Sequence, residues 1–253
     1  MARRSSAGNP ARTLALLWRH TDGRSRPGPR PSRSVDDVVG AAVDLADREG
    51  LDAVTVRKVA DRLGVAPMTL YTHVPGKAEL LDLLLDDIYL RMEHADTTGQ
   101  PWRDRVTAVA DDNRRLFRRH PWAVAVSTVR PPLGPGLIAK YDRELRAFDD
   151  TGLADVDRDA ALTFVLGFVR VTSLAEIEVT TARRDSAIDD QQWWHTTQPL
   201  LAELVDEAAY PTASRVGTAA GHAHAAAYDP DHAYRFGLRR VLDGLATLVD
   251  DHQ

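Results

Sequence analysis

A glycine that separates two short helical segments constrains this chain more than any other feature of its sequence. Thr55 is suited to cap a first helix, which carries the small Ala60 on its inner face and ends at Gly64. A second helix, Pro67–His73, begins on a proline, the residue favoured in the first turn of a helix. Gly64 supplies the backbone freedom that a tight turn needs, and Ala60 permits a close crossing. This spacing predicts a helix-turn-helix.

The second helix of the pair is too short to be stable alone, so Val65 and Leu70 should anchor it on the helices beneath. Its outward side is then available for the major groove of DNA. Hydroxyl, phenol, imidazole and ammonium groups can contact phosphates or base edges there. The predicted DNA-binding residues lie on that side and at the neighbouring helix starts: Thr55, Arg57, Pro67, Met68, Thr69, Tyr71, Thr72, His73 and Lys77.

Helical periodicity extends over the rest of the chain. Ser34 can cap a helix of about 35–49, and a longer helix opens at Lys77. The stretch 210–228 is expected to be a break. No segment alternates with period two, so the sequence predicts an all-α fold. Further helices are expected near 102–119, 121–129, 136–150, 156–183, 190–209 and 230–250.

Charge is distributed unevenly along the chain. Residues 1–34 contain eight arginines and one acidic residue, a net charge of +7, whereas the chain as a whole carries −5. Residues 1–33 are therefore predicted to be a disordered basic arm, within which Thr13–Arg19 could form a helical turn. Such an arm could assist DNA binding electrostatically, or it could be a passive tail that keeps the protein soluble.

Composition excludes several classes of site. The chain has no cysteine, which rules out disulfides, thiolate metal sites and cysteine nucleophiles. Its longest uninterrupted apolar runs are short, and the N-terminus lacks the pattern of a secretory signal. We expect a cytoplasmic protein with no membrane partner.

Residues 54–81 read VTVRKVADRLGVAPMTLYTHVPGKAELL. This run resembles the DNA-binding domain of the tetracycline-repressor (TetR) family, with Ala66 in place of the usual Ser or Gly and Val74 in place of the usual Phe. The resemblance implies that Tyr71, His73 and Lys77 contact phosphates, while Met68 and Thr69 lie nearest the bases. Ala66 removes a capping hydrogen bond at the start of the second helix. We accordingly predict a three-helix DNA-binding head at 34–80.

The segment from Trp102 to Glu178 resembles the ligand-binding domain of the tetracycline-repressor branch. The motifs that carry this resemblance are RRHPW at 118–122, RPPLGPG at 130–136 and FVLGFV at 164–169. The resemblance implies that residues 81–253 form a helical bundle for effector binding and dimerisation.

The effector pocket is expected between the middle helices of that bundle. Its candidate residues are also ordinary core residues: Phe117, Trp122, Phe164, Phe168 and Arg170. Arg170 and Glu176 interrupt an apolar helix, and a buried charge needs a partner.

Two apolar stripes, one in the helix expected near 156–183 and one in the helix expected near 230–250, are predicted to pair with their copies in a four-helix interface across a two-fold axis. Packing of both stripes within one chain is the alternative. The residues proposed for the interface are Val171, Ala175, Leu238, Val241, Leu245 and Leu248. A two-fold dimer suits a palindromic operator.

A group of histidines and aspartates could suggest a metal site, although a solvated loop is the preferred interpretation: His222, His224, Asp229, Asp231 and His232. The sequence indicates no resident cofactor. An unidentified small-molecule effector is expected, and a magnesium-chelated ligand, as tetracycline repressors bind, is less favoured.

The sequence thus predicts a homodimeric repressor that a small molecule releases from double-stranded DNA. A helical enzyme is the first alternative, but no nucleophile elbow, phosphate loop or dinucleotide fingerprint supports it. An architectural DNA binder without an effector is the second, and the size of the C-terminal region argues against it.

Overall fold

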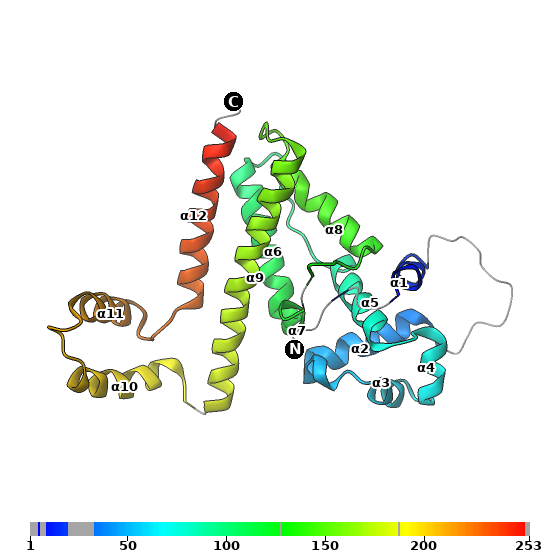
Figure 1. Ribbon diagram of the computed structural model, residues 1–253, viewed down its shortest axis with the longest axis horizontal. Coiled ribbons are helices and arrows are strands. Elements are labelled where there is room, and N and C mark those ends of the chain that lie inside the picture. The colour runs from blue at the N-terminus through cyan, green and yellow to red at the C-terminus, as the bar shows by residue number, and fades with distance from the viewer. Residues whose placement is uncertain (1–4, 6–8, 20–32, 127, 187, 251–253) are drawn as a thin grey trace.

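The computed structural model describes residues 5, 9–19, 33–126, 128–186 and 188–250, and no strand occurs among them. The predicted all-α class is therefore confirmed. Three parts are visible in Figure 1, to which we refer as the head (residues 34–84), the body (residues 85–186 and 230–250) and the arm (residues 190–224).

The helices of the head begin and end where the sequence predicts. They are α2 (Val35–Glu49), α3 (Val56–Leu63) and α4 (Pro67–His73), with a 3-10 turn, η1 (Leu51–Ala53), between the first two. A complete capping box starts α2, because the Ser34 hydroxyl accepts from the Asp37 amide and the Asp37 carboxylate accepts from the Ser34 amide. These local signals set the bounds of the head helices.

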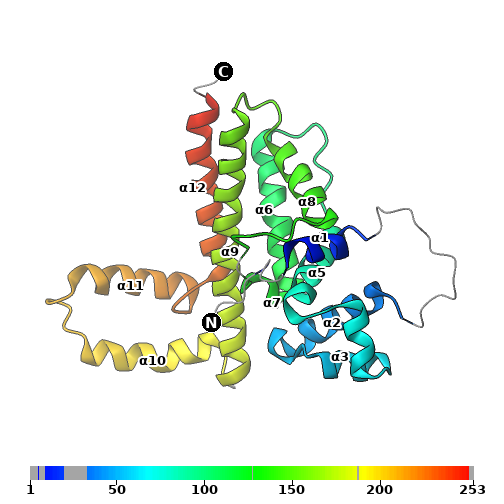
Figure 2. The same cartoon turned by 45° about the vertical axis from the view of Figure 1, so that its right-hand side comes forward.

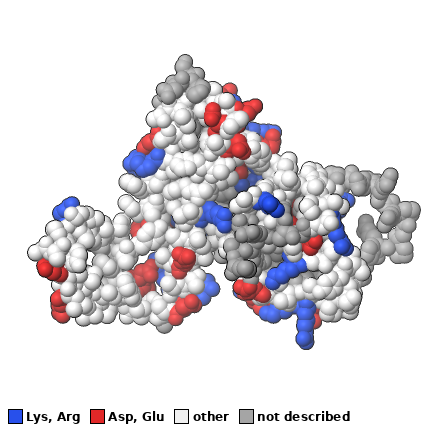
Figure 3. Space-filling model, viewed as in Figure 1, with Lys and Arg blue, Asp and Glu red and all other residues white. Residues whose placement is uncertain are grey.

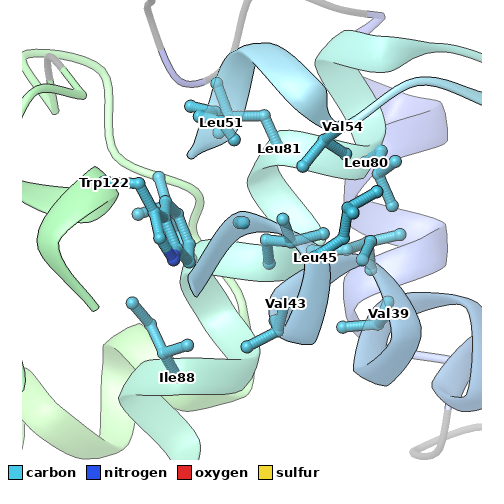
Figure 4. Packing of buried hydrophobic residues seen from close by; sticks show 14 of the residues in the cluster. Val39, Val43, Leu45, Leu51, Val54, Leu80, Leu81, Ile88 and Trp122 are labelled. Carbon is cyan, nitrogen blue, oxygen red and sulfur yellow. The ribbon is translucent and has the colours of Figure 1, made fainter. Parts of the chain in front are cut away.

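The long helix α5 (Lys77–Leu90) connects head and body, so the boundary expected at residue 80 falls inside one continuous helix. Leucines near its start pack with α2 and η1, as Figure 4 shows for Leu80 and Leu81 beside Val54 and Leu51. Leu84 and Leu85 are completely buried. The head therefore shares its core with the first helix that leads into the body.

The body consists of α6 (Trp102–Arg119), the single turn α7 (Pro121–Val124), α8 (Pro135–Leu145), a 3-10 turn η2 (Arg146–Phe148), α9 (Asp155–Ser186) and α12 (Pro230–Asp250). Helix α9 packs against both α6 and α12 around a second apolar cluster that includes Val106, Phe148 and Val165.

Helix α8 is joined to α5 through a carboxylate. Asp86 accepts hydrogen bonds from the amides of Gly136 (3.2 Å) and Leu137 (2.9 Å), which belong to the first turn of α8. A Cβ at Gly136 would lie 2.0 Å from the Asp86 carbonyl oxygen, so only glycine permits this approach. Burial raises the pKa of the Asp86 carboxyl, and these amide hydrogen bonds counteract that effect.

The arm is formed by α10 (Asp190–Leu204) and α11 (Pro211–His224), and it projects from the body in both views (Figures 1 and 2). The expectation of a break at 210–228 is wrong, because α11 occupies most of that stretch. Pro211 lies in the first turn, and the alanine-rich sequence that follows has high helix propensity despite Gly217 and Gly221.

An additional helix, α1 (Pro10–Leu17), precedes the head and lies against α5. The prediction of a disordered N-terminal segment is wrong for residues 10–12, and the helical turn suggested within Thr13–Arg19 belongs to α1, whose Leu17 is buried in the same cluster as α2 and α5. Asn9 caps the helix by accepting from the Arg12 amide. The other positions of the predicted arm, 1–4, 6–8 and 20–32, lie outside the described residues.

Helix α9 contains a stretch that is long and apolar enough to cross a membrane, with a mean hydropathy of 1.6 over 18 residues, of which 28% are buried. One side of this stretch, including Leu162, Val165 and Val169, packs into the body. The opposite side, including Phe164 and Val171, is exposed. The apolar composition of α9 thus serves the core on one side and leaves a second apolar face uncovered.

Candidate DNA-binding and effector-binding sites

The turn between α3 and α4 has the geometry of a helix-turn-helix. Thr55 caps α3 by accepting from the Lys58 amide, and Gly64 ends it with a φ of +68°, in the left-handed region. Ala60 is completely buried where the helices cross, and Leu70 anchors α4 with only 3% of its surface exposed. The anchored inner side leaves the opposite side of α4 facing outward.

None of the nine predicted DNA-binding residues is buried. Met68 and Tyr71 are 73% and 45% exposed on α4, and Thr69 and His73 are half-buried beside them. Five more are exposed: Thr55, Arg57, Pro67, Thr72 and Lys77. The structure therefore places all nine on the outer surface of the helix-turn-helix or at the start of α5.

Two of the hydroxyl groups already make local hydrogen bonds. The Thr55 hydroxyl is used in the cap of α3, and the Thr72 hydroxyl donates to the carbonyl of Thr69 at 2.6 Å. No side chain caps α4 at Ala66, as that substitution predicts, and none caps α5 at Gly76. The amides at the start of α5 beside Lys77 consequently form an electropositive helix end that suits a phosphate.

Basic side chains are visible at the lower edge of the head in Figure 3, the edge where α3 and α4 lie in Figure 1. Lys58 and Arg62 on α3 pair with Glu49 and Asp44 of α2, so these two bases also hold the head together. Arg57 is exposed on the first turn of α3.

The five residues predicted for the effector pocket have different surroundings in the structure. Phe164 is 57% exposed on the outer face of α9, whereas Phe168 stacks on Tyr234 of α12. The Trp122 indole N–H donates to Asp47 of the head, and Phe117 lies between the two apolar clusters. A pocket shared by these residues therefore stays a prediction.

Both charges that interrupt α9 have the partners that their burial requires. Arg170 donates to the carbonyl of Val124 at 2.9 Å, and Glu176 accepts from Arg114 at 2.9 Å and Arg118 at 2.7 Å. Arg114 also reaches Asp231 of α12 at 2.6 Å. This network joins α6, α9 and α12.

A buried polar cluster between α5, α6 and α8 was missed by the sequence analysis. Lys140 and Glu144 form an ion pair of 2.7 Å, with side chains 7% and 3% exposed. The Asn113 amide donates to the same carboxylate at 2.5 Å, and the Lys140 ammonium lies 5.5 Å from the centre of the Tyr89 ring. Spacing of four residues on one helix is equally typical of a surface pair, so only the burial identifies this cluster.

A cavity of about 430 Å³ lies beside this cluster, and Glu144 is part of its wall together with His94 and Asp112. The His94 imidazole is 3.6 Å from the Asp112 carboxylate. Burial lowers the pKa of His94 and raises that of Asp112, so each group is shifted towards its neutral form. A larger cavity of about 510 Å³ lies between α2, α5 and α6 and also includes Asp112.

Three of the residues predicted for the dimer interface are buried in their own chain. Leu238, Val241 and Leu245 are 5–8% exposed because this stripe of α12 packs against α9. Packing within one chain, the alternative that the sequence left open, is what the structure shows for these three residues. Val171 and Leu248 are exposed and Ala175 is half-buried. Other exposed apolar side chains of α9 and α12 are Val156, Phe164, Leu174 and Phe236.

The histidine and aspartate group lies where α11 leads into α12. The rings of His224 and His232 are 4.6 Å apart, and His224 is 3.7 Å from the Asp229 carboxylate. Within the described ranges, no three His, Asp or Glu side chains are arranged to hold a metal ion.

Two family models match most of the chain. Residues 38–84 match "Bacterial regulatory proteins, tetR family", and residues 95–249 match "Tetracyclin repressor-like, C-terminal domain". Neither match includes α1.

Individual relatives agree with these matches. The transcriptional repressor DrrR1 of Streptomyces coeruleorubidus is 37% identical over 246 residues, covering 97% of this chain and 88% of the relative. The class D tetracycline repressor of Escherichia coli is 30% identical over 67% of this chain and 77% of its own. The crystal structure of apo ActR from Streptomyces coelicolor has a similar fold, with a TM-score of 0.70 and 22% identity over 89% of this chain and all of that one.

Proposed function

Because this chain belongs to the tetR family of bacterial regulatory proteins, we propose that it is a homodimeric repressor that a small molecule releases from a palindromic operator. The observation that carries the proposal is the outward face of α4, held by the buried Leu70 and presenting Met68 and Tyr71. Such a face fits the major groove, while Lys77 and the start of α5 are suited to a neighbouring phosphate. The family acts on DNA in the cytoplasm, where this protein is proposed to work.

The dimer is proposed to form through exposed apolar side chains of α9 and α12. Phe164, Val171 and Leu174 lie on one side of α9, and Phe236 and Leu248 are exposed on α12. A second copy that covers these residues would remove their apolar side chains from water. The exposed arm adds further apolar side chains that the same partner could cover.

The effector is proposed to bind in the body near the polar cluster of Lys140, Glu144 and Asn113. Buried polar groups that converge beside a cavity are typical of a small-molecule site. A structural neighbour has been solved with a small molecule: ActR, at 23% identity, in complex with actinorhodin. A ligand that prefers the conformation with displaced heads would lower DNA affinity.

The test begins with selection of duplexes from a random library by the wild-type protein, followed by affinity measurement on the selected duplex. Tyr71→Ala is expected to weaken binding by about tenfold, as for the loss of one good contact of about 1–3 kcal/mol. Lys77→Ala should weaken binding and reduce the salt dependence by about one unit of slope. Tyr141→Ala is the matched control, because Tyr141 is 40% exposed on α8, which neither the DNA-binding face nor the proposed dimer interface includes.

Two results would contradict the proposal. The first is a wild-type protein that selects no common sequence at modest salt. The second is a loss of the dimer in Tyr71→Ala and Lys77→Ala, which would assign these residues a structural role.

For the effector, candidate ligands including tetracycline and actinorhodin are screened by thermal shift, with and without magnesium. A true effector must raise the melting temperature and weaken binding to the selected duplex.

A further inference from the structure

The N-terminal helix α1 contacts both the head and the body, and neither the DNA-binding nor the effector-binding proposal uses it. Figure 2 shows α1 beside α5, above the head. Its Leu17 side chain is 1% exposed and belongs to the cluster that contains Val38 and Val39 of α2 and Leu84 of α5. Burial of a leucine side chain removes a large apolar surface from water, so Leu17 contributes substantially to the attachment of α1. Leu17 is therefore the anchor of α1.

On the head side, α1 is joined to the first turn of α2. The guanidinium of Arg19, just after α1, pairs with the carboxylate of Asp36. The same guanidinium donates to the carbonyl of Leu16 at 2.8 Å. Since the Asp36 side chain is 45% exposed, this ion pair orients α2 more than it stabilises the attachment.

On the body side, α1 is joined to the segment 128–134, which leads into α8. The indole N–H of Trp18 donates to the carbonyl of Leu133 at 2.8 Å, and the Ser5 hydroxyl donates to the carbonyl of Arg130 at 2.5 Å. This segment ends where Asp86 of α5 caps α8. Helix α1 thus contacts the body at the junction of α5 and α8.

The other end of α2 is held to the body independently. The Asp47 carboxylate accepts from the Trp122 indole N–H at 2.7 Å, and the same oxygen lies 2.8 Å from Nδ1 of His120. The eleven residues from Asp36 to Asp47 span about 16 Å of helix. With α1 at one end and Asp47 at the other, α2 is tied to the body at two well-separated points.

We propose that α1 is an interdomain clamp that holds α2 in the orientation that binds DNA. The proposal rests on the DNA-binding function proposed above and adds a device that sets the position of the head. Without the clamp, α2 would keep its packing against α5 and its attachment at Asp47 but would lose the restraint at its first turn, so this end of α2 could move relative to the body. The head would then be in the binding position for a fraction of the time, and the apparent affinity falls in proportion to that fraction. The effector has to overcome the same clamp.

Leu17→Ala tests the clamp without changing any charge. Leu14→Ala is the matched control, because Leu14 is 40% exposed on the same helix. Hydrogen exchange on the free full-length protein should show faster exchange in α2 and in 128–134 together for Leu17→Ala. Affinity for the duplex selected by the wild-type protein should fall about tenfold if about a tenth of the heads remain in position. Leu14→Ala should change neither measurement.

Trp18→Phe is the second variant, since it keeps an aromatic side chain but removes the hydrogen bond to Leu133. It should shift both measurements in the same direction by a smaller amount, and thermal melts confirm that each variant is folded.

The clamp is refuted if faster exchange is confined to α1 while α2, 128–134 and DNA affinity stay at wild-type values. Tighter DNA binding by Leu17→Ala would also refute it. If the wild-type protein selects no duplex, the DNA-binding proposal fails instead, and the exchange data still show whether α1 ties α2 to the body.

Discussion

The head and the arm are both made of short helices with apolar side chains, but only the head buries them within its own chain. Helix α2 alone places Val38, Val39 and Leu45 in the core with at most 3% exposure. In the arm, α10 buries no residue, and α11 buries only Gly221. The head is therefore stabilised by its own packing, whereas the arm has apolar side chains that its own chain does not cover.

The arm has some internal contact. A Cβ at Gly221 would lie 2.3 Å from the Trp194 ring, so the two helices approach closely at this point. Beyond that contact, Leu200, Leu201 and Leu204 are 58%, 47% and 83% exposed. Apolar surface of this kind marks an interaction site. In the dimer that we propose, the arm would reach its final packing against the second copy.

Truncation of one leucine in each region is the strongest test of the difference in packing between the head and the arm. Leu84→Ala removes a completely buried side chain and is expected to destabilise the protein by about 2–5 kcal/mol. Leu201→Ala should cost less than about 1 kcal/mol in dilute protein, because that side chain is half exposed. Denaturant unfolding of both variants at low protein concentration measures the difference. Equal losses would mean that the arm is packed as firmly as the head.

A charge on the exposed face of α9 tests whether a second copy covers the surfaces that this chain leaves open. Val171→Glu is expected to weaken the dimer by about tenfold or more, because an unpaired carboxylate would become buried in the interface. Sedimentation equilibrium measures this effect, and Leu90→Glu is the control at a site that is 58% exposed on α5. Hydrogen exchange in α10 and α11 should become faster in Val171→Glu while the head stays protected. A Val171→Glu variant that dimerises like the wild type would exclude this face as the interface.

Alanine in place of glycine should have opposite effects in the two regions. Gly64 has a φ of +68°, so Gly64→Ala is expected to destabilise the head by about 1–2 kcal/mol. Gly217 is helical, and a Cβ added there would meet no atom within 4 Å, so Gly217→Ala should stabilise α11 by about 0.5–1 kcal/mol. Thermal unfolding of each variant gives the sign. A loss of stability in Gly217→Ala would show that α11 is held by close contacts that involve Gly217.

The smallest expected effect is a dependence of stability on pH that belongs to the body and not to the arm. Burial lowers the pKa of His94 below its ordinary value of 6.5. At pH values between the lowered pKa and 6.5, the unfolded chain therefore binds more protons than the native one. Stability from this group is present above pH 6.5 and is lost as the pH falls towards the lowered pKa. His94→Gln should reduce that slope, and His195→Gln, exposed on the arm, is the control. An unchanged slope in His94→Gln would assign the pH dependence to other groups.

The sequence by itself determined the helix-turn-helix almost completely. The bounds of α2 and α4 follow from Ser34, Gly50 and Pro67, which act within one helical turn of the residues they affect. The outward placement of Met68 and Tyr71 follows from the need to bury Leu70. The residues at the helix ends and the period of the apolar positions were sufficient to predict the helix bounds and the outward face, because few other arrangements satisfy both.

Only the tertiary structure decided which faces and charges are buried. Periodicity shows that α12 has an apolar stripe but not what covers it, so Leu238 was predicted to face a second copy although it packs on α9. A lysine and a glutamate four residues apart read equally well as a surface pair, yet Lys140 and Glu144 lie in the interior. Leu17 is likewise buried only because α5 and α2 lie beside it. Burial depends on neighbours that are distant in the chain, and the order of residues along one helix does not record them.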